Sequence, residues 1–235
     1  MNSTTRKRTT KTLASIAGLA LLAVPLAACG SEDDNDSGSS SSSSSSSSST
    51  ASVPEPVASI GDLSTDGGTT AVKLDPDTLK ALEGLKVTPG VSGTAKLEDG
   101  SIIFPITGGN VTVFKKDAVP RYVVGQVQHE GSGLTLTAGS TEVTVGNFNV
   151  DPTVSIVYGD VMAGSKVVAS SIPVLRLDGR TLQTPTFDNG EAVLQGSGVF
   201  LTAGAADLLN QTFGTDALTD QTKIGVATIT AKIPA

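Results

Sequence analysis

Hydrophobic and polar residues alternate with a period of two along much of the chain after Gly100. In residues 122–128, Val123, Gly125 and Val127 alternate with Tyr122, Val124, Gln126 and Gln128. In 134–137 and 142–146, Leu or Val at every second position alternates with Thr, Glu or Gly. Strands with one buried face have this pattern, and turn signals such as Asp178-Gly179 and Asp188-Asn189-Gly190 separate the stretches. The pattern predicts a mainly β fold: an antiparallel β-sandwich or a barrel-like domain with one or two short helices.

The first of these helices is predicted just after Asp75. Asp75 is a suitable N-cap, Pro76 suits the first helical position, and Gly84 suits the position just beyond the end. Leu79 and Leu82 lie three residues apart and share one face. So short a helix needs to dock on the rest of the domain to persist.

A second helix is predicted between Thr202 and Gly214, with the threonine as its cap and the glycine at its end. Ala206, Leu209 and Phe213 recur at helical spacing, so they form one apolar face. We expect this helix to close an open end of the sheet.

Residues 69–235 suffice for one domain. This stretch holds about 165 residues, enough to bury a single hydrophobic core. It is rich in Val, Ile, Leu and Thr, and it has no Trp. Val, Ile and Thr favour pleated sheet.

The N-terminal segment has the order of a secretion signal. Basic residues lie between Arg6 and Lys11, an apolar stretch runs from 13 to 28, and the tetrapeptide Leu26-Ala27-Ala28-Cys29 follows. Small residues directly before a cysteine resemble the lipobox of bacterial lipoproteins. The resemblance implies that residues 1–28 are a signal peptide, that the thiol of Cys29 receives a diacylglycerol, and that its freed amine is open to acylation.

Residues 29–68 are predicted to be a tether. They hold an acidic cluster at 32–36 and an unbroken serine run from 39 to 49. Such a composition cannot form a packed core. With a lipid at Cys29, we expect the domain to stand on the outer face of the bacterial cytoplasmic membrane, exposed to the cell wall.

The charge of the mature chain narrows the choice of partners. Removing residues 1–28 removes four of 16 basic residues and none of 23 acidic ones, which leaves a formal charge of −11. Nucleic acids select basic surfaces, so we expect no nucleic-acid partner. Cys29 is the single cysteine, so no disulfide, thiolate metal site or cysteine nucleophile remains after lipidation.

The residues that could perform catalysis are few. His129 is the single histidine, and the segment around Ser132 has no glycine two positions before the serine, as a nucleophile elbow requires. Zinc needs several His or Cys ligands. Asp75 with Asp77, and Asp188 with Asn189, are candidate calcium ligands, but neither pair has EF-hand spacing. We therefore predict no catalytic residue and no metal site.

The segment from Gln128 to Thr137, with sequence QHEGSGLTLT, places His129 before a Gly-Ser-Gly turn at the end of a predicted strand. It resembles the glycine-flanked histidine segment of HtaA-type haem-binding domains of actinobacterial surfaces. The stretches FPITGG (104–109), YGDV (158–161), LRLDG (175–179), LTAGAADLL (201–209) and GVATITA (225–231) follow the order of those domains. The resemblance extends from about Gly93 to Ile233.

This resemblance implies haem as a cofactor. In the family, a tyrosine near the domain start binds the iron, within an aromatic-rich segment. This chain departs from that pattern, because no aromatic residue lies between Met1 and Ile103. If haem binds, the candidate residues are His129 with Tyr122 or Tyr158.

Three hypotheses about function follow. The first is a non-enzymatic, lipid-anchored envelope protein whose domain binds a cell-envelope component. The second is capture of haem or another small ligand by an HtaA-like domain. The third is an envelope hydrolase that uses His129.

Overall fold

The computed structural model describes residues 54–65 and 67–233. The predicted signal peptide, Cys29 and the serine run lie outside the described residues. Among the described residues, no helix is long and apolar enough to cross a membrane.

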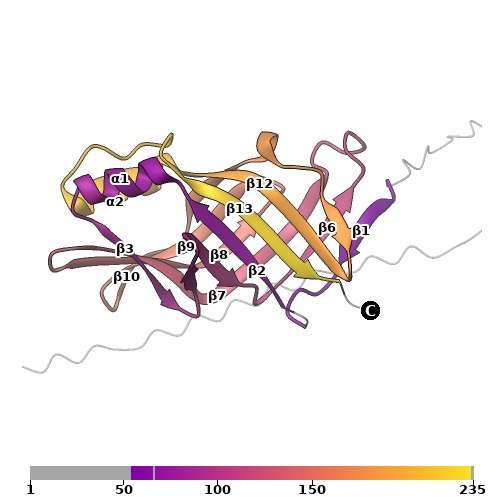
Figure 1. Ribbon diagram of the computed structural model, residues 1–235, viewed down its shortest axis with the longest axis horizontal. Coiled ribbons are helices and arrows are strands. Elements are labelled where there is room, and N and C mark those ends of the chain that lie inside the picture. Colours follow the sequence, from indigo (N-terminus) through magenta and orange to yellow (C-terminus); the bar gives the residue numbers. More distant parts are fainter. Residues whose placement is uncertain (1–53, 66, 234–235) are drawn as a thin grey trace, which may run out of the picture. The chain divides into compact units, whose positions relative to one another are not determined.

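Thirteen strands form one antiparallel sheet, which confirms the mainly β prediction (Figure 1). The strands are β1 (Pro56–Ile60), β2 (Gly68–Leu74), β3 (Thr88–Gly93), β4 (Lys96–Glu98), β5 (Ser101–Pro105), β6 (Gly108–Phe114), β7 (Val123–Ala138), β8 (Thr141–Asp151), β9 (Ile156–Ala163), β10 (Lys166–Asp178), β11 (Thr186–Asp188), β12 (Glu191–Leu201) and β13 (Lys223–Lys232). Their order is β1-β6-β7-β8-β9-β10-β12-β13-β2-β5-β4, with β11 paired to β12 and β3 paired to β7.

The sheet curls until its two flanks meet. β5 and β6 are consecutive in sequence, but they do not pair with each other: β5 pairs with β2 and β4, while β6 pairs with β1 and β7. Thr107 therefore lies where the chain passes from one flank to the other. Its backbone N–H donates to the carbonyl of Gln128 at 2.8 Å, and its hydroxyl oxygen accepts the N–H of Glu130 at 2.8 Å. We call the place where β7 meets β2 and β5 the seam.

Both predicted helices form. The helix α1 (Pro76–Gly84) begins after Asp75, whose carboxylate accepts the N–H of Asp77, and it ends one residue later than expected, with Leu85 as its C-cap. The helix α2 (Ala203–Phe213) begins after Thr202, whose hydroxyl accepts the N–H of Ala205. A single 3-10 turn, η1 (Gly179–Thr181), follows β10.

The second helix ends as its sequence predicts. Gly214 has a φ of +64°, the left-handed conformation that glycine adopts without steric cost. Ala206 and Leu209 are buried and Phe213 packs against the core, so the predicted apolar face is the inward face.

The folded sheet reaches further toward the N-terminus than residue 69. Strand β1 and the start of β2 lie within the segment that we expected to be tether, and β1 pairs with β6 from Pro56↔Phe114 to Ile60↔Val111. Ile60 is buried, so this short strand contributes to the core.

One turn prediction was wrong. The Gly-Ser-Gly segment after His129 does not end a strand, because β7 continues to Ala138. The register between β7 and β8 shifts between His129 and Gly133, which makes this segment a β-bulge. A bulge and a turn both select glycine, since each needs a positive φ, and Gly131 has a φ of +70°.

Candidate functional site

A cavity of about 620 Å³ occupies the inside of the curled sheet. At one end, which we call the helix end, Leu79 and Leu82 of α1 and Leu208 and Leu209 of α2 line it. The other end, which we call the loop end, is lined by segments that connect strands. These are the β6–β7 connection (Pro120–Tyr122), the β8–β9 connection (Pro152, Val154 and Ser155) and η1 with Leu182.

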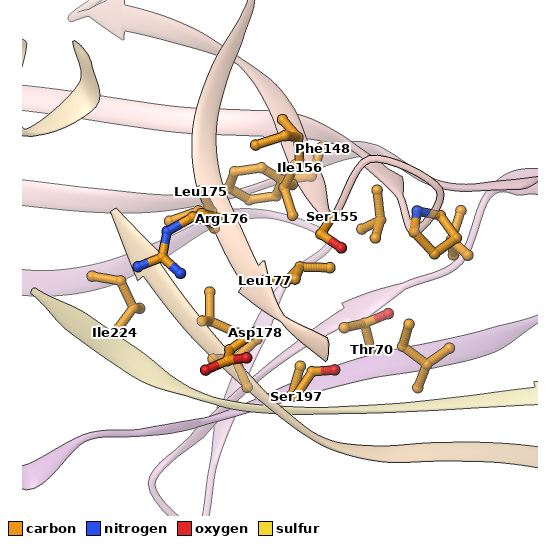
Figure 2. A pocket seen from close by; sticks show the side chains of 18 of the residues that line it. Thr70, Phe148, Ser155, Ile156, Leu175, Arg176, Leu177, Asp178, Ser197 and Ile224 are labelled. Atoms are coloured by element: carbon orange, nitrogen blue, oxygen red, sulfur yellow. The ribbon is translucent and has the colours of Figure 1, made fainter. Parts of the chain in front are cut away.

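The wall of the cavity is mainly apolar. Val127 of β7, Phe148 of β8 and Val199 of β12 are buried within it, and Figure 2 shows part of the lining, including Phe148 and Leu177. Alternating residues along each strand point inward, which is why the period-2 pattern of the sequence becomes one continuous apolar surface. The volume and the character of the wall fall within the range of pockets that hold small ligands.

His129 lies on this wall and is almost completely buried, with 1% of its surface exposed. Its Nδ1 lies 2.9 Å from the carbonyl oxygen of Pro105, and its Nε2 lies 3.1 Å from the hydroxyl oxygen of Thr70. Pro105 belongs to β5 and Thr70 to β2, so the imidazole of β7 connects the two flanks at the seam.

These two partners determine the state of the imidazole. A carbonyl oxygen only accepts, so Nδ1 carries the hydrogen, and the lone pair of Nε2 accepts the hydroxyl hydrogen of Thr70. Burial lowers the pKa of His129 below its ordinary value, because the charged ring would lose its hydration, and the Pro105 carbonyl offsets part of that effect. His129 is therefore neutral at pH 7.

Two aromatic rings fix the orientation of His129 from inside the cavity. The Phe104 ring lies 6.1 Å from the imidazole, centroid to centroid, at 56°. Phe148 meets Phe104 edge to face at 5.3 Å and 83°. Phe148 is also the cross-strand partner of His129. The three rings thus form one packed group, and each ring nitrogen of His129 has a hydrogen-bond partner.

The bulge after His129 allows β7 to contact β3 and β8 closely. A Cβ at Gly133 would lie 2.7 Å from the Ser92 hydroxyl oxygen and 2.8 Å from the Val145 carbonyl oxygen. Opposite the bulge, Asn147 adopts a φ of +51°, and its side-chain oxygen accepts the Gly131 N–H at 2.9 Å. Glycine at 133 is thus required by the close approach of three strands.

A second polar group holds Asn147 on the outer face of the sheet. Its amide donates to Asp160 at 2.9 Å, and Asp160 also accepts from the Ser170 hydroxyl at 2.7 Å and the Ser171 N–H at 2.9 Å. Hydrogen bonds from Asn147, Ser170 and Ser171 lower the pKa of Asp160. These contacts connect β8, β9 and β10 where their registers shift, and they give the acidic YGDV stretch a structural role.

The two tyrosines have different positions. Tyr122 lies next to Arg121 in the β6–β7 connection and lines the cavity at the loop end. Tyr158 of β9 does not line the cavity. The residues on either side of it, Val157 and Gly159, are buried, and its cross-strand partners are Asn149 and Pro173. The structure therefore places His129 and Tyr122 on the same cavity and Tyr158 outside it.

Thr70 and three arginines are functional candidates that sequence reasoning did not single out. Thr70 is 59 residues from His129, and no local pattern connects the two. Arg121, Arg176 and Arg180 all line the cavity, and they are the only arginines in the part of the chain that the structure describes. The number of arginines could be read from the sequence, but their common position around the cavity could not.

The candidate calcium ligands have structural positions. Asp75 caps α1 and lies 3.4 Å from the Lys223 ammonium, while Asp188 is the last residue of β11, where the chain turns into β12. Within the described ranges, no group of three or more His, Cys, Asp or Glu side chains is placed to hold a metal ion.

Comparison with solved structures identifies the fold. The C-terminal domain of HtaA from Corynebacterium glutamicum superposes with a TM-score of 0.50 at 14% identity, over 71% of this chain and 96% of that domain. The N-terminal domain of HtaA has a TM-score of 0.37 at 13% identity, over 73% and 99% of the two chains. The haem-binding protein HtaB of the same organism has a TM-score of 0.39 at 8% identity, over 74% and 96%. No protein-family model matches this chain, and no curated protein matches it in sequence.

Proposed function

We propose that this chain is a non-enzymatic, lipid-anchored envelope protein that binds a small apolar molecule inside its curled sheet. The observation that carries the proposal is the cavity of about 620 Å³ with its mainly apolar wall. A domain of this size normally fills its interior with side chains to a density near that of an organic crystal. A cavity of this volume with an open, loop-lined end is instead typical of a ligand site.

The test is a titration of the mature chain, residues 29–235, with N-phenyl-1-naphthylamine, an uncharged apolar dye that fluoresces when it leaves water. Production without residues 1–28 and with Cys29→Ala removes both the apolar signal segment and the site of lipidation, so detergent is not needed and cannot occupy the cavity. We expect a saturable increase in fluorescence with about one dye per chain. The absence of saturable binding would overturn the proposal.

Variants that fill the cavity identify where the dye binds. Leu177 of β10 lines the cavity, whereas Val168 of the same strand is half exposed and does not line it. Leu177→Trp should weaken dye binding at least fivefold, and Val168→Trp should leave it unchanged. Ser197→Phe places bulk at a second lining position and answers the same question if Leu177→Trp does not fold. Equal binding by all variants would place the dye outside the cavity.

Haem is the second candidate, because His129 lies on the cavity wall and because the chain resembles HtaA-type domains in sequence and shares the fold of the C-terminal domain of HtaA. Haem iron needs an axial ligand. Here Nε2 of His129 already accepts the Thr70 hydroxyl, and Tyr158 lies outside the cavity. The family's tyrosine lies near the domain start, and the side chain that meets His129 from there is that of Thr70, which has no aromatic ring. Tyr122 lines the same cavity at its loop end, but among the described residues no hydrogen bond or ring contact joins it to His129.

A comparison of haem with metal-free protoporphyrin IX separates the two candidates. If the cavity binds by its apolar surface alone, both porphyrins should bind with affinities within about threefold of each other. Iron ligation by His129 would instead favour haem by more than tenfold. Thr70→Val is nearly isosteric and frees Nε2, so it would strengthen haem binding further in that case and would leave protoporphyrin binding unchanged.

A further inference from the structure

Arginine and lysine are unevenly distributed around the cavity. All three arginines of the described residues line it, and none of the nine lysines in the same ranges does. The acidic side chains in the lining are Asp75 and Asp178. The lining thus carries three positive and two negative charges in a mature chain whose formal charge is −11.

Arginine and lysine differ in a way that makes this choice informative. The guanidinium is planar and presents paired N–H donors that match the two oxygens of a carboxylate or phosphate, and it loses its hydration more easily than an ammonium does. For a charge that only keeps the protein soluble, lysine would serve as well as arginine. Arginine restricted to the lining of an otherwise apolar cavity therefore indicates recognition of an anion.

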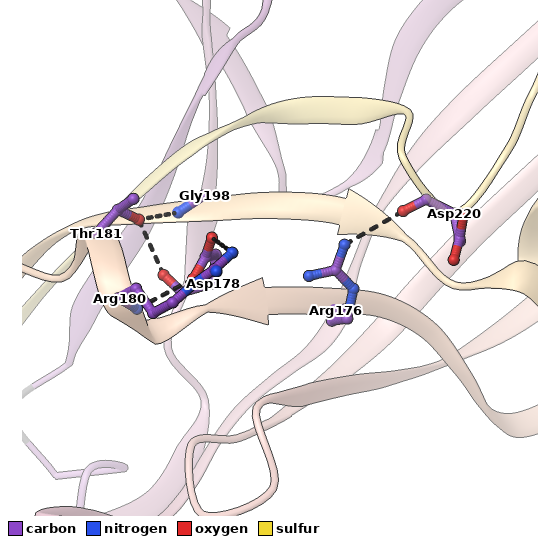
Figure 3. A network of polar contacts seen from close by, with 6 residues as sticks. All are labelled: Arg176, Asp178, Arg180, Thr181, Gly198 and Asp220. Carbon is purple, nitrogen blue, oxygen red and sulfur yellow. Dashed lines mark hydrogen bonds and ion pairs between the residues drawn. The ribbon is translucent and has the colours of Figure 1, made fainter.

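Two of the three arginines already have partners (Figure 3). Arg180 forms a bidentate pair with Asp178, with Nε to Oδ1 at 3.0 Å and Nη2 to Oδ2 at 2.9 Å. Arg176 lies over the Phe200 ring at 4.7 Å, and its Nη2 donates to the Asp220 carbonyl at 3.3 Å. Both guanidinium groups are held in place by these contacts.

Arg121 is different. Among the described residues it has no ion pair and no side-chain hydrogen bond, and its side chain is exposed. It lies at the loop end, next to the half-buried ring of Tyr122. This end therefore combines an unengaged guanidinium with side chains that line the apolar cavity.

We infer that the ligand is an amphiphile with an apolar body and one acidic head, carboxylate or phosphate, whose head lies at Arg121. This inference rests on the proposed function and specifies its ligand class. The apolar body occupies the interior between the seam and the helices, where the wall is apolar. The head remains at the loop end, where solvent and Arg121 compensate its charge.

Two dyes with the same ring system test this inference. 1-Anilinonaphthalene-8-sulfonate is N-phenyl-1-naphthylamine with one added sulfonate, so the ratio of their affinities isolates the effect of a negative charge. We expect the anionic dye to bind at least threefold more tightly at low salt, and the difference to shrink at 0.5 M NaCl, because salt screens charges at exposed sites. Equal affinity, or tighter binding of the uncharged dye, would overturn the inference.

Natural head groups are then compared by displacement of the uncharged dye. Dodecanoate, dodecyl phosphate and dodecanol share one chain length and differ only in the head. Both anions should displace the dye at concentrations at least threefold lower than dodecanol does. The order of dodecanoate and dodecyl phosphate distinguishes a fatty-acid type of head from a phospholipid type.

Arg121→Gln and Lys116→Gln form a matched pair of variants. Each removes one positive charge from the β6–β7 connection, but Lys116 does not line the cavity. Arg121→Gln should abolish the preference for anions and leave the uncharged dye unaffected, whereas Lys116→Gln should retain the preference. If both variants lose it equally, net charge and not Arg121 is responsible. Failure of the uncharged dye to bind at all would instead contradict the proposed function itself.

Discussion

The two ends of the cavity are built by different means. At the helix end, α2 buries Ala205, Ala206 and Leu209, and its N-cap Thr202 also donates a hydrogen bond to the Pro173 carbonyl at 2.7 Å. At the loop end, Val154 and Phe187 line the cavity with 50% and 39% of their surfaces exposed. The apolar side chains of α2 are thus packed at the helix end, where Leu79 of α1 is 37% exposed, whereas Val154 and Phe187 face water at the other end.

This difference assigns separate tasks to the two ends. Buried helix contacts stabilise the fold in proportion to the apolar area that they remove from water. Exposed apolar side chains beside a cavity contribute little to stability, and they gain contacts only when something covers them. Stability should therefore depend on the helix end, and binding on the loop end.

The largest expected effect is the difference in the free energy of unfolding between one substitution at each end. Leu209→Ala removes a buried side chain of α2 and should lower the free energy of unfolding by about 3 kcal/mol. Phe187→Ala removes a larger but half-exposed side chain and should cost about 1 kcal/mol or less. Denaturant unfolding followed by circular dichroism measures both. Similar losses at the two sites would contradict the division of tasks.

A change of pH should affect the seam before it affects the loop end. His129 is buried and neutral, with a pKa below the ordinary 6.5, so the unfolded chain binds a proton first as the pH falls. Stability is therefore full above pH 6.5 and decreases as the pH falls from 6.5 toward the folded pKa. The Asp178–Arg180 pair at the loop end persists over the same range, because its hydrogen bonds lower the pKa of Asp178 to about 2.

Proton NMR measures the folded-state pKa directly. His129 is the single histidine of the chain, so its ring gives a resolved resonance whose titration needs no assignment. We expect a midpoint below pH 6.5, together with a melting temperature that falls between pH 6.5 and 5. A midpoint at or above 6.5 would show that the imidazole is not held neutral at the seam.

The smallest expected effect concerns the ion pair at the loop end. Asp178→Asn removes the carboxylate that engages Arg180, whose side chain is 88% exposed, so stability should not change measurably. The released guanidinium adds a second group for an acidic head, and the affinity for 1-anilinonaphthalene-8-sulfonate should rise about twofold. Weaker binding of this dye would show that Asp178 orders the loop end rather than competing with the ligand.

Local signals in the sequence predicted the helices well. Each helix is delimited by residues at its own ends: α1 begins at Asp75 and Pro76, and α2 lies between Thr202 and Gly214. Such capping signals do not depend on the rest of the fold. The Asp188-Asn189-Gly190 turn is local in the same way, with positive φ at Asn189 and Gly190. The antiparallel class also followed from the alternation together with the turn signals between the alternating stretches.

The site was only partly predictable, because its contacts are not local. His129 stood out as the single histidine, but its partners Thr70 and Pro105 lie 59 and 24 residues away and meet it only because the sheet curls. The Gly131 segment was interpreted as a turn because glycine serves turns and bulges alike. Strand β1 lies within a segment rich in turn residues and is recognised only through its pairing with β6.

Strand β1 also determines how the domain responds to tension. It is the outermost strand of its flank, paired with β6 alone, and the chain toward the N-terminus continues from Pro56. A force applied through that part of the chain would separate β1 from β6 before it reached β7 and His129. Because Ala58, Ser59 and Ile60 of β1 line the cavity, its detachment under load would open the cavity wall before any other strand was displaced.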